Sequence, residues 1–303
     1  MKPAVLFAVS AFLFSASLAK MPDTMFVATP LTPVHSFTEG IEGPAVDARG
    51  NIYAVNYARQ QTIGKVSPDG AGEVFLTLPG KSTGNGIRFN RQGDMFIADY
   101  VEHAIYKVAS GHNTPIVHAR EDRMSQPNDI AITAQGVLYA SDPDWAHGTG
   151  RVWRIDLDGK VKLVAEHMGT TNGIEVSPDG NTLYVNESVQ RAVWAFTIAP
   201  DGSLHDKRLV IQFVDFGLDG MRVDVEGNLY VTRHGKGTVV KLTPTGNILQ
   251  EIDVLGAMPS NICFGGPDGR TAYVTEVEKG RLVQFRIDSP GLEWERSRPI
   301  SSN

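Results

Sequence analysis

Short runs in which apolar and polar residues alternate recur along most of this chain. Alternation with a period of two is typical of β-strands that are buried on one face. Pairs such as Asp158-Gly159 separate many of these runs, and Asp-Gly and Asn-Gly pairs form tight hairpin turns. Residues 152–155 and 239–242 are clear examples of the flanking runs. The pattern predicts an all-β protein, and no segment beyond residue 20 shows the period of a helix.

One unit of this pattern occurs six times along the chain. Each copy opens on a polar residue, passes through an apolar run to a glycine turn, and ends on a second apolar run that contains an aromatic residue. In the first five copies the turn glycine lies eight residues after the leading polar residue. The leading residues, at spacings of 43, 43, 44, 47 and 41, are Glu42, Asn85, Asn128, Asn172, Asp219 and Ser260.

A four-stranded unit that recurs every 41 to 47 residues is typical of one blade of a β-propeller. The six copies predict a six-bladed β-propeller with four antiparallel strands per blade, formed as a single domain over residues 20–303. Residues 25–37 precede the first complete copy, so we expect this N-terminal strand to complete the last blade and close the ring. A β-sandwich would not account for the fixed period.

The first nineteen residues have a different pattern. Lys2 precedes an almost wholly apolar run over residues 5–14, and Ser17-Leu18-Ala19 places small residues where a signal peptidase reads them. This predicts a cleavable signal peptide over residues 1–19 and a secreted or periplasmic protein. A retained membrane anchor is the alternative, although the apolar run is short for a bilayer. After cleavage we expect no association with a membrane.

Composition narrows the possible partners. The chain of 303 residues has a net charge of −6, so it offers no basic surface for nucleic acid. Cys263 is the only cysteine, which excludes an intrachain disulfide. We therefore expect a monomer that acts on a small molecule.

The six leading residues are candidates for a metal site. The first strand of each propeller blade lines the central channel, so equivalent positions of the six copies meet around the axis. All six side chains carry an oxygen, and Glu42 and Asp219 are carboxylates. Such a set suits one divalent cation, with Ca²⁺ favoured and Mg²⁺, Mn²⁺ or Zn²⁺ as alternatives. Ordinary turn formation by Asn-Gly and Asp-Gly pairs is the competing interpretation, but glutamate is a poor turn residue.

Four short motifs occur in blade order, with a weaker fifth one. They are Glu42-Gly43-Pro44, Pro127-Asn128-Asp129, Thr171-Asn172-Gly173-Ile174, Leu218-Asp219-Gly220-Met221 and Pro259-Ser260-Asn261. On these motifs the chain resembles the senescence-marker-protein/gluconolactonase family of lactonases, whose relatives include diisopropylfluorophosphatase. The resemblance extends over nearly all of the chain beyond the predicted signal peptide.

This resemblance implies roles for four of the leading residues. Glu42, Asn172 and Asp219 correspond to metal ligands, and Asn128 to a residue beside the metal that serves as a ligand or a substrate contact. Asp219 also corresponds to the general base or nucleophile. The family's fold is the propeller that the repeats predict, and its activity implies hydrolysis of a sugar-acid lactone such as gluconolactone.

The resemblance weakens around the substrate. Animal members carry an arginine where this chain has Gln126, and a glutamate of theirs has no clear match near Trp145 and His147. We expect Asn85 and Asn128 to orient the substrate, and we take Gln126, His147 and His234 as further candidate contacts.

The polar residues at the ends of the second strands, on the same face, form a further candidate set. We expect most of them to form a solvated rim and some of them the pocket wall; they are Asn56, Asp99, Asp142, Glu187, His234 and Glu276.

Three functions compete at this stage. The first is a lactonase in which the cation polarises the carbonyl group and Asp219 acts as base or nucleophile. The second is a phosphotriesterase-like hydrolase on the same scaffold, and the third is a non-enzymatic binding propeller with a structural cation. Chemistry of the Ser-His-Asp type is not supported, because no Gly-x-Ser-x-Gly element sits between a strand and a helix.

Overall fold

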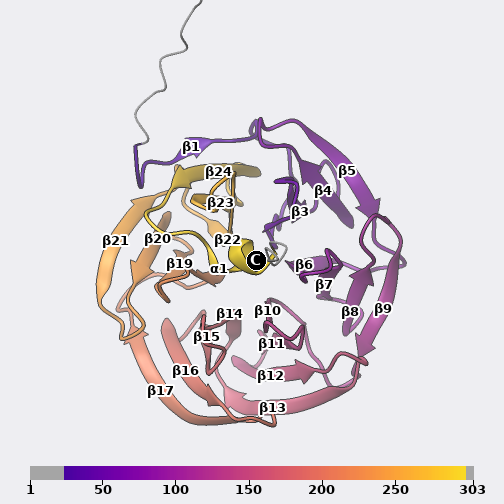
Figure 1. The fold of residues 1–303 in the computed structure, drawn as a ribbon, viewed down its shortest axis with the longest axis vertical. Coiled ribbons are helices and arrows are strands. Elements are labelled where there is room, and N and C mark those ends of the chain that lie inside the picture. Colours follow the sequence, from indigo (N-terminus) through magenta and orange to yellow (C-terminus); the bar gives the residue numbers. More distant parts are fainter. Residues whose placement is uncertain (1–23, 298–303) are drawn as a thin grey trace, which may run out of the picture.

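Six antiparallel sheets of four strands each stand around a central axis (Figure 1). This arrangement, in a computed structural model that describes residues 24–297, confirms the predicted six-bladed all-β propeller. Five blades use four strands that are consecutive in the sequence, whereas the sixth combines the two ends of the described chain. The predicted signal peptide, residues 1–19, lies outside the described residues.

The first three blades contain strands β2 to β13. Blade 1 consists of β2 (Ala45–Val46), β3 (Ile52–Val55), β4 (Thr62–Val66) and β5 (Gly72–Thr77). Blade 2 consists of β6 (Gly84–Phe89), β7 (Met95–Asp99), β8 (Ala104–Val108) and β9 (Pro115–Arg120). Blade 3 consists of β10 (Ile130–Ile132), β11 (Leu138–Asp144), β12 (Thr149–Ile155) and β13 (Val161–Met168).

The other three blades complete the ring. Blade 4 consists of β14 (Thr171–Val176), β15 (Thr182–Glu187), β16 (Ala192–Ile198) and β17 (Leu204–Gln212). Blade 5 consists of β18 (Met221–Val223), β19 (Leu229–Arg233), β20 (Thr238–Leu242) and β21 (Ile248–Asp253). Blade 6 consists of β22 (Pro259–Gly265), β23 (Thr271–Glu276), β24 (Arg281–Arg286) and β1 (Thr29–Pro30).

The N-terminal strand closes the last blade, as predicted. In β1, Thr29 pairs with Gln284 and Pro30 with Val283, so β1 becomes the outermost strand of blade 6. The contact continues on both sides of this short ladder. The amide of Phe26 donates to the carbonyl oxygen of Arg286 at 2.8 Å, and the amide of Leu31 donates to that of Leu282 at 2.9 Å.

The hydrophobic core lies between neighbouring blades, because each sheet buries both faces against the next one. One cluster joins Tyr230 of blade 5 to Phe264 of blade 6, whose ring centroids lie 5.1 Å apart. The inner strand β22 is buried along its whole length, whereas the outer strand β21 buries only Ile252. Burial therefore decreases from the axis of the ring to its outer edge.

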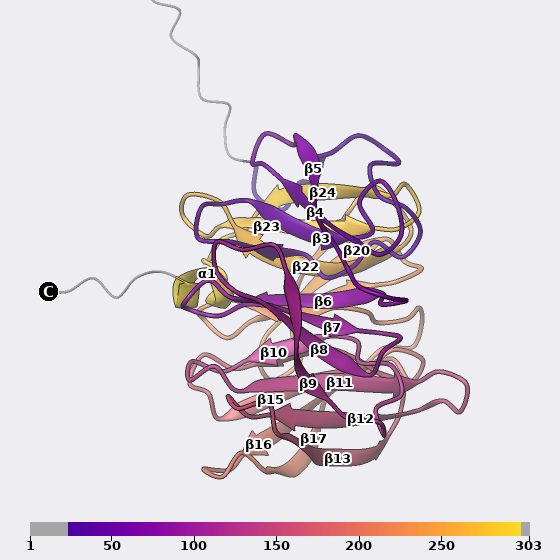
Figure 2. The ribbon, with the colours of Figure 1, turned by 90° about the vertical axis from the view of Figure 1, so that its right-hand side faces the viewer.

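The sequence analysis missed a short C-terminal helix. Helix α1 (Leu292–Ser297) lies on the axis of the ring, at one face of the disc (Figure 1, Figure 2). Acidic residues in its first turn and Arg296 in its last turn complement the helix dipole. Arg296 donates to the carbonyl oxygens of Ile132 and Ser177, both at 3.0 Å, which fixes the helix across the channel. Six residues are too few to display a helical period in the sequence. Within residues 24–297, no helix is long and apolar enough to cross a membrane.

Candidate metal and substrate site

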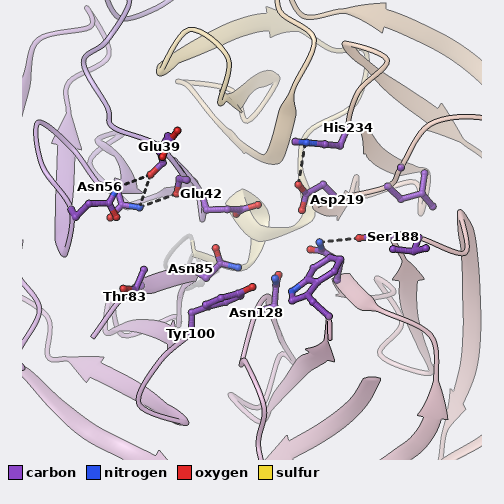
Figure 3. A pocket seen from close by; sticks show the side chains of 18 residues that line it. Glu39, Glu42, Asn56, Thr83, Asn85, Tyr100, Asn128, Ser188, Asp219 and His234 are labelled. Carbon is purple, nitrogen blue, oxygen red and sulfur yellow. Dashed lines mark hydrogen bonds and ion pairs between the residues drawn. The ribbon is translucent and has the colours of Figure 1, made fainter. Parts of the chain in front are cut away.

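A cavity of about 510 Å³ opens on the axis at the starts of the first strands, whereas Arg296 of α1 contacts Ile132 and Ser177 at their far ends. Five of the six leading residues line it, which are Glu42, Asn85, Asn128, Asn172 and Asp219. Figure 3 shows Glu42, Asn85, Asn128 and Asp219 reaching toward a common centre from different blades. The repeat therefore brings together residues that lie up to 177 positions apart, from Glu42 to Asp219.

The local cause of this convergence is a break in strand pairing. The ladder between the first and second strands is interrupted between Gly84 and Ile87 in blade 2 and between Thr171 and Ile174 in blade 4. Such β-bulges let two successive residues turn toward the same side of a sheet. As a result the leading residue and the residue after it both face the axis.

Ser260 departs from the predicted ring. Its hydroxyl oxygen donates to the carbonyl oxygen of Ile41 at 2.7 Å and lies 2.7 Å from the Thr275 hydroxyl, and Ser260 does not line the cavity. In blade 6 the next residue reaches the site instead. The Asn261 amide donates to Oε2 of Glu42 at 3.0 Å, so a residue outside the predicted set holds the first carboxylate in place.

Three oxygens of the ring are buried and, among the described residues, accept no hydrogen bond. They are Oε1 of Glu42, Oδ1 of Asn128 and Oδ1 of Asn172. Buried polar atoms without partners are rare, and each one calls for an explanation. The Asn172 amide nitrogen donates to the Ser188 hydroxyl at 3.0 Å, and this bond fixes which way its oxygen points.

The donor set fits a hard divalent cation. Carboxylate and amide oxygens are the ligands that Ca²⁺ takes, and its coordination geometry is tolerant. The described residues contain no group of three His, Cys, Asp or Glu side chains that could hold a metal, so any site here must depend on amide oxygens as well as on Glu42 and Asp219. Zinc, which prefers nitrogen and sulfur ligands, suits this set less well.

The ionised forms of both carboxyl groups are unfavourable unless a positive charge lies nearby. Burial raises the pKa of Glu42 to about 7, and the Asp129 carboxylate adds to this rise. Burial also raises the pKa of Asp219, with a further contribution from the nearby Glu42. A cation between them would offset both effects, because an opposite charge favours the ionised form.

A glycine layer lies directly below the ring. The residues that follow the leading positions are Gly43, Gly86, Asp129, Gly173, Gly220 and Asn261. A Cβ atom at Gly220 would lie 2.0 Å from the Asn261 side chain, and one at Gly86 would lie 2.7 Å from the Asp129 carboxylate. Glycine is therefore required at these positions so that two larger side chains can fill the channel.

Asp129 fills this layer as an ion pair. Its carboxylate lies 3.2 Å from Arg88 and 3.0 Å from Arg222, and all three side chains are almost fully buried. Burial works against its ionisation, yet Arg222 and Arg88 hold the pKa of Asp129 below its usual value. Below this layer Arg222 also faces Glu293 of α1 at 3.7 Å.

The residues at the ends of the second strands are anchors for loops rather than a solvated rim, which corrects the expectation from the sequence. Asp99 accepts from the amides of Thr83 and Val101 at 3.2 and 2.9 Å, and Asp142 accepts from those of Ser125 and Gln126 at 2.8 and 2.6 Å. Glu187 and Glu276 are buried and bind loop amides in the same way. Asn56 accepts from the amide of Gln61 at 3.2 Å.

His234 lines the cavity, but it lies one residue beyond the strand-end position assigned to it from the sequence. The pairing of Arg233 with Thr238 matches that of Glu276 with Arg281, so Arg233 and not His234 occupies the position of the anchors. Arg233 binds Asp215 at 2.7 Å. His234 then lies one residue further along and faces Asp219, with Nδ1 3.5 Å from Oδ2.

The other two candidate contacts do not line the cavity. His147 is 75% exposed and pairs with Asp144 at 2.8 Å, so the structure places it on the surface. Gln126 does not line the cavity, although its side chain hydrogen-bonds Tyr100. Burial raises the pKa of Tyr100, and hydrogen bonding by the Trp145 and Gln126 side chains acts against that rise.

Tyr100 and Trp145 line the cavity, and the sequence analysis did not assign them to it. Tyr100 directly follows the second strand of blade 2, and Trp145 lies in the turn between β11 and β12. Tyr100 follows the strand-end acid Asp99 by one residue, and Trp145 follows Asp142 by three. This spacing is the sequence signal that could have identified both residues.

Comparisons with known proteins agree with this geometry. The family model described as the SMP-30/gluconolactonase/LRE-like region matches residues 37–278. The chain is 26% identical to the gluconolactonase of Zymomonas mobilis over 285 residues, which cover 82% of this chain and 79% of that protein. It is 26% identical to the 6-deoxy-6-sulfogluconolactonase of Pseudomonas putida over 172 residues, which cover 55% of this chain and 59% of that protein.

A solved structure has the same fold. The calcium-binding protein regucalcin of Agrobacterium tumefaciens superposes with a TM-score of 0.74 at 20% identity, over 87% of this chain and 97% of that chain. At this level of identity the likeness supports the propeller architecture alone.

Proposed function

Since the chain belongs to the SMP-30/gluconolactonase/LRE-like family, we propose that it is a metal-dependent lactonase that opens the ring of a sugar-acid lactone such as gluconolactone. The observation that carries this proposal is the convergence of three unpaired buried oxygens with the Asp219 carboxylate at one cavity. A propeller that bound a partner without any cation would have no need of two buried carboxylates at its axis.

Four side chains would hold the metal, which are those of Glu42, Asn128, Asn172 and Asp219. Ca²⁺ is the ion that their oxygens suit best. When bound, the cation would supply a Lewis acid for the carbonyl oxygen of the lactone. Glu42 is positioned for this task by the Gly43 amide and by Asn261, both of which donate to its Oε2.

Asp219 provides the base or the nucleophile. It takes a proton from the attacking water, or attacks the carbonyl carbon itself, and the bond from that carbon to the ring oxygen breaks. In the first route Asp219 returns the proton that it accepted to the ring oxygen, which leaves as a hydroxyl group. In the second route the ring oxygen takes its proton from water, and water then hydrolyses the mixed anhydride on Asp219 and regenerates the carboxylate. The product is the open-chain hydroxy acid.

Other side chains of the cavity orient the substrate. Asn85 and Asn128 present amide groups to it, and the Asn85 side chain makes no hydrogen bond to other described residues. His234 lies beside Asp219 and limits the positions that a water molecule or a substrate can take there.

A panel of substrates with and without EDTA tests this function. We expect hydrolysis of at least one aldonolactone, loss of that activity in EDTA, and recovery on addition of Ca²⁺. Hydrolysis of an organophosphate in place of every lactone would favour the phosphotriesterase-like alternative. Tight metal binding without turnover of any ester would favour a binding propeller.

We also propose that the protein acts outside the cytoplasm as a monomer. The proposed export rests on the pattern of residues 1–19. N-terminal sequencing of the exported protein should begin near Lys20, and its mass in solution should be that of one chain.

A further inference from the structure

The walls of the cavity above the metal ring are largely apolar. Tyr100, Trp145, Val189 and Leu218 all line it. Trp145 is 37% exposed and Val189 is 62% exposed, although both are large hydrophobic residues that usually pack inside. Figure 3 places Tyr100 beside Asn85 and Asn128, so its aromatic ring adjoins the polar floor. A ligand on the floor would therefore contact apolar surface on its upper side.

No cationic side chain is available to a ligand in the cavity. Across residues 24–297, no lysine or arginine lines it, whereas Glu39, Glu42 and Asp219 do. Glu39 is exposed at the mouth and would remain negative after a cation had balanced the other two carboxylates. The negative charge of the cavity lining therefore repels anionic ligands.

The arginines beneath the floor do not change this conclusion. Arg88 and Arg222 are both paired with Asp129, and Arg222 also faces Glu293. Their charges are therefore balanced within the channel. At the mouth, Asn56 and Gln60 already donate to backbone carbonyl oxygens, at 2.9 Å to Gly40 and at 2.7 Å to Glu39. These two amide groups at the mouth are therefore already engaged.

We propose, on the basis of the proposed lactone hydrolysis, that this site selects electrically neutral lactones and rejects those that carry a phosphate, sulfonate or carboxylate group. Tyr100 and Trp145 form the surface against which the apolar face of the neutral ring packs. Aromatic side chains bind such faces well because they combine area with rigidity. An anionic substituent would lose its water without gaining a partner, and Glu39 would repel it.

Paired substrates test the selectivity. The kcat/KM of the wild-type protein for a neutral aldono-1,5-lactone should exceed that for the same lactone with a 6-phosphate or 6-sulfonate by about tenfold or more. Trp145→Gln should raise the KM for the neutral lactone, whereas Trp145→Phe should retain a KM near the wild-type value. Equal kcat/KM values for the neutral and anionic lactones would overturn the proposal.

A charge added to the wall provides the sharper test. Val189→Arg should shift the preference toward the anionic lactone by about tenfold, because it supplies the missing partner. Val189→Gln controls for the change in polarity. Val214→Arg adds the same charge at a residue that is 91% exposed and does not line the cavity, so it should leave the preference nearly unchanged. A preference unaffected by Val189→Arg would contradict the proposal.

Binding of unreactive analogues separates this inference from the proposed activity. The neutral lactam of the same ring and its 6-phosphate derivative would be titrated calorimetrically into the Ca²⁺-loaded protein. Tighter binding of the neutral lactam, without turnover of any lactone, would support the selectivity and refute the hydrolysis. Equal affinity for the two lactams, or binding of neither, would refute the selectivity even if a lactone is hydrolysed.

Discussion

Nδ1 of His234 lies 3.5 Å from Oδ2 of Asp219, and both side chains line the axial cavity. Burial lowers the pKa of His234 below its ordinary value, so its imidazole is mainly neutral near pH 7. A neutral ring adds no positive charge beside Asp219. The carboxyl group therefore depends on another cation for its ionisation, and the histidine restricts its position.

Replacement of Asp219 by asparagine should remove activity but preserve the fold. The amide is similar in shape and avoids the cost of a buried carboxylate, so we expect the melting temperature to change little. Loss of a base or nucleophile should lower kcat by about a thousandfold. Steady-state kinetics and circular dichroism measure the two effects. His234→Gln is the matched comparison and should have a smaller effect on kcat; turnover near the wild-type rate in Asp219→Asn would remove Asp219 from the mechanism.

Replacement of Glu42 by glutamine should weaken the cation site. A cation that binds only the native state increases the free energy of unfolding by mass action, by about 3 kcal/mol at a hundred times its Kd, and so raises the melting temperature. We expect Glu42→Gln to lose most of the Ca²⁺-dependent rise in melting temperature. Glu39→Gln, at the exposed mouth of the same cavity, should keep it. The same Ca²⁺-dependent rise in both variants would show that Glu42 is not a ligand.

The stability of the metal-free protein should fall as the pH rises from about 4.5 to about 7. Glu42 has a pKa of about 7 in the folded protein, above the 4.5 of an unperturbed glutamate. Between these values the native state binds more protons than the unfolded state, so the free energy of unfolding decreases with pH. Urea unfolding in EDTA at pH 5 and pH 8 measures this. Saturating Ca²⁺ and Glu42→Gln should each reduce the difference, and an unchanged pH dependence in the variant would exclude Glu42 as its source.

Removal of the Asp129 carboxylate should destabilise the protein strongly, because Arg88 and Arg222 would remain buried without their partner. Asp129→Asn leaves Arg88 and Arg222 without their central anion, and breaking a buried pair costs about 3 kcal/mol or more. Asp268→Asn removes the carboxylate that pairs with Arg286, where the acid is half exposed, and should cost less than about 1 kcal/mol. Chemical denaturation of both variants makes the comparison. Equal losses would mean that the channel ion pairs are not a major source of stability.

The propeller could be predicted from the sequence because its evidence is repeated six times. A spacing of 41 to 47 residues between leading residues gives the length of a blade. If one copy were misaligned, the other copies would still indicate the same blade length. Equivalence of the copies then brings five leading residues, from Glu42 to Asp219, to one cavity.

Details that depend on an offset of one residue could not be predicted in this way. The bulge near Ser260 decides whether Ser260 or Asn261 faces the site. Neighbouring residues of similar polarity give no signal for such shifts. The aromatic wall is a separate case, because Trp145 lies on a turn whose course is not set by the repeat.

The pairing of β1 with β24 has a consequence for how the chain folds. Thr29 and its partner Gln284 are separated by nearly the whole described sequence, so the ring cannot close until blade 6 has been synthesised. Contacts between such distant residues slow folding, because a long loop must be ordered before it is stabilised. Until then, blades 1 to 5 can form only an incomplete, open ring. A circular permutant in which a linker joins the end of α1 to the segment before β1, with new termini between two other blades, should acquire native structure faster than the natural chain.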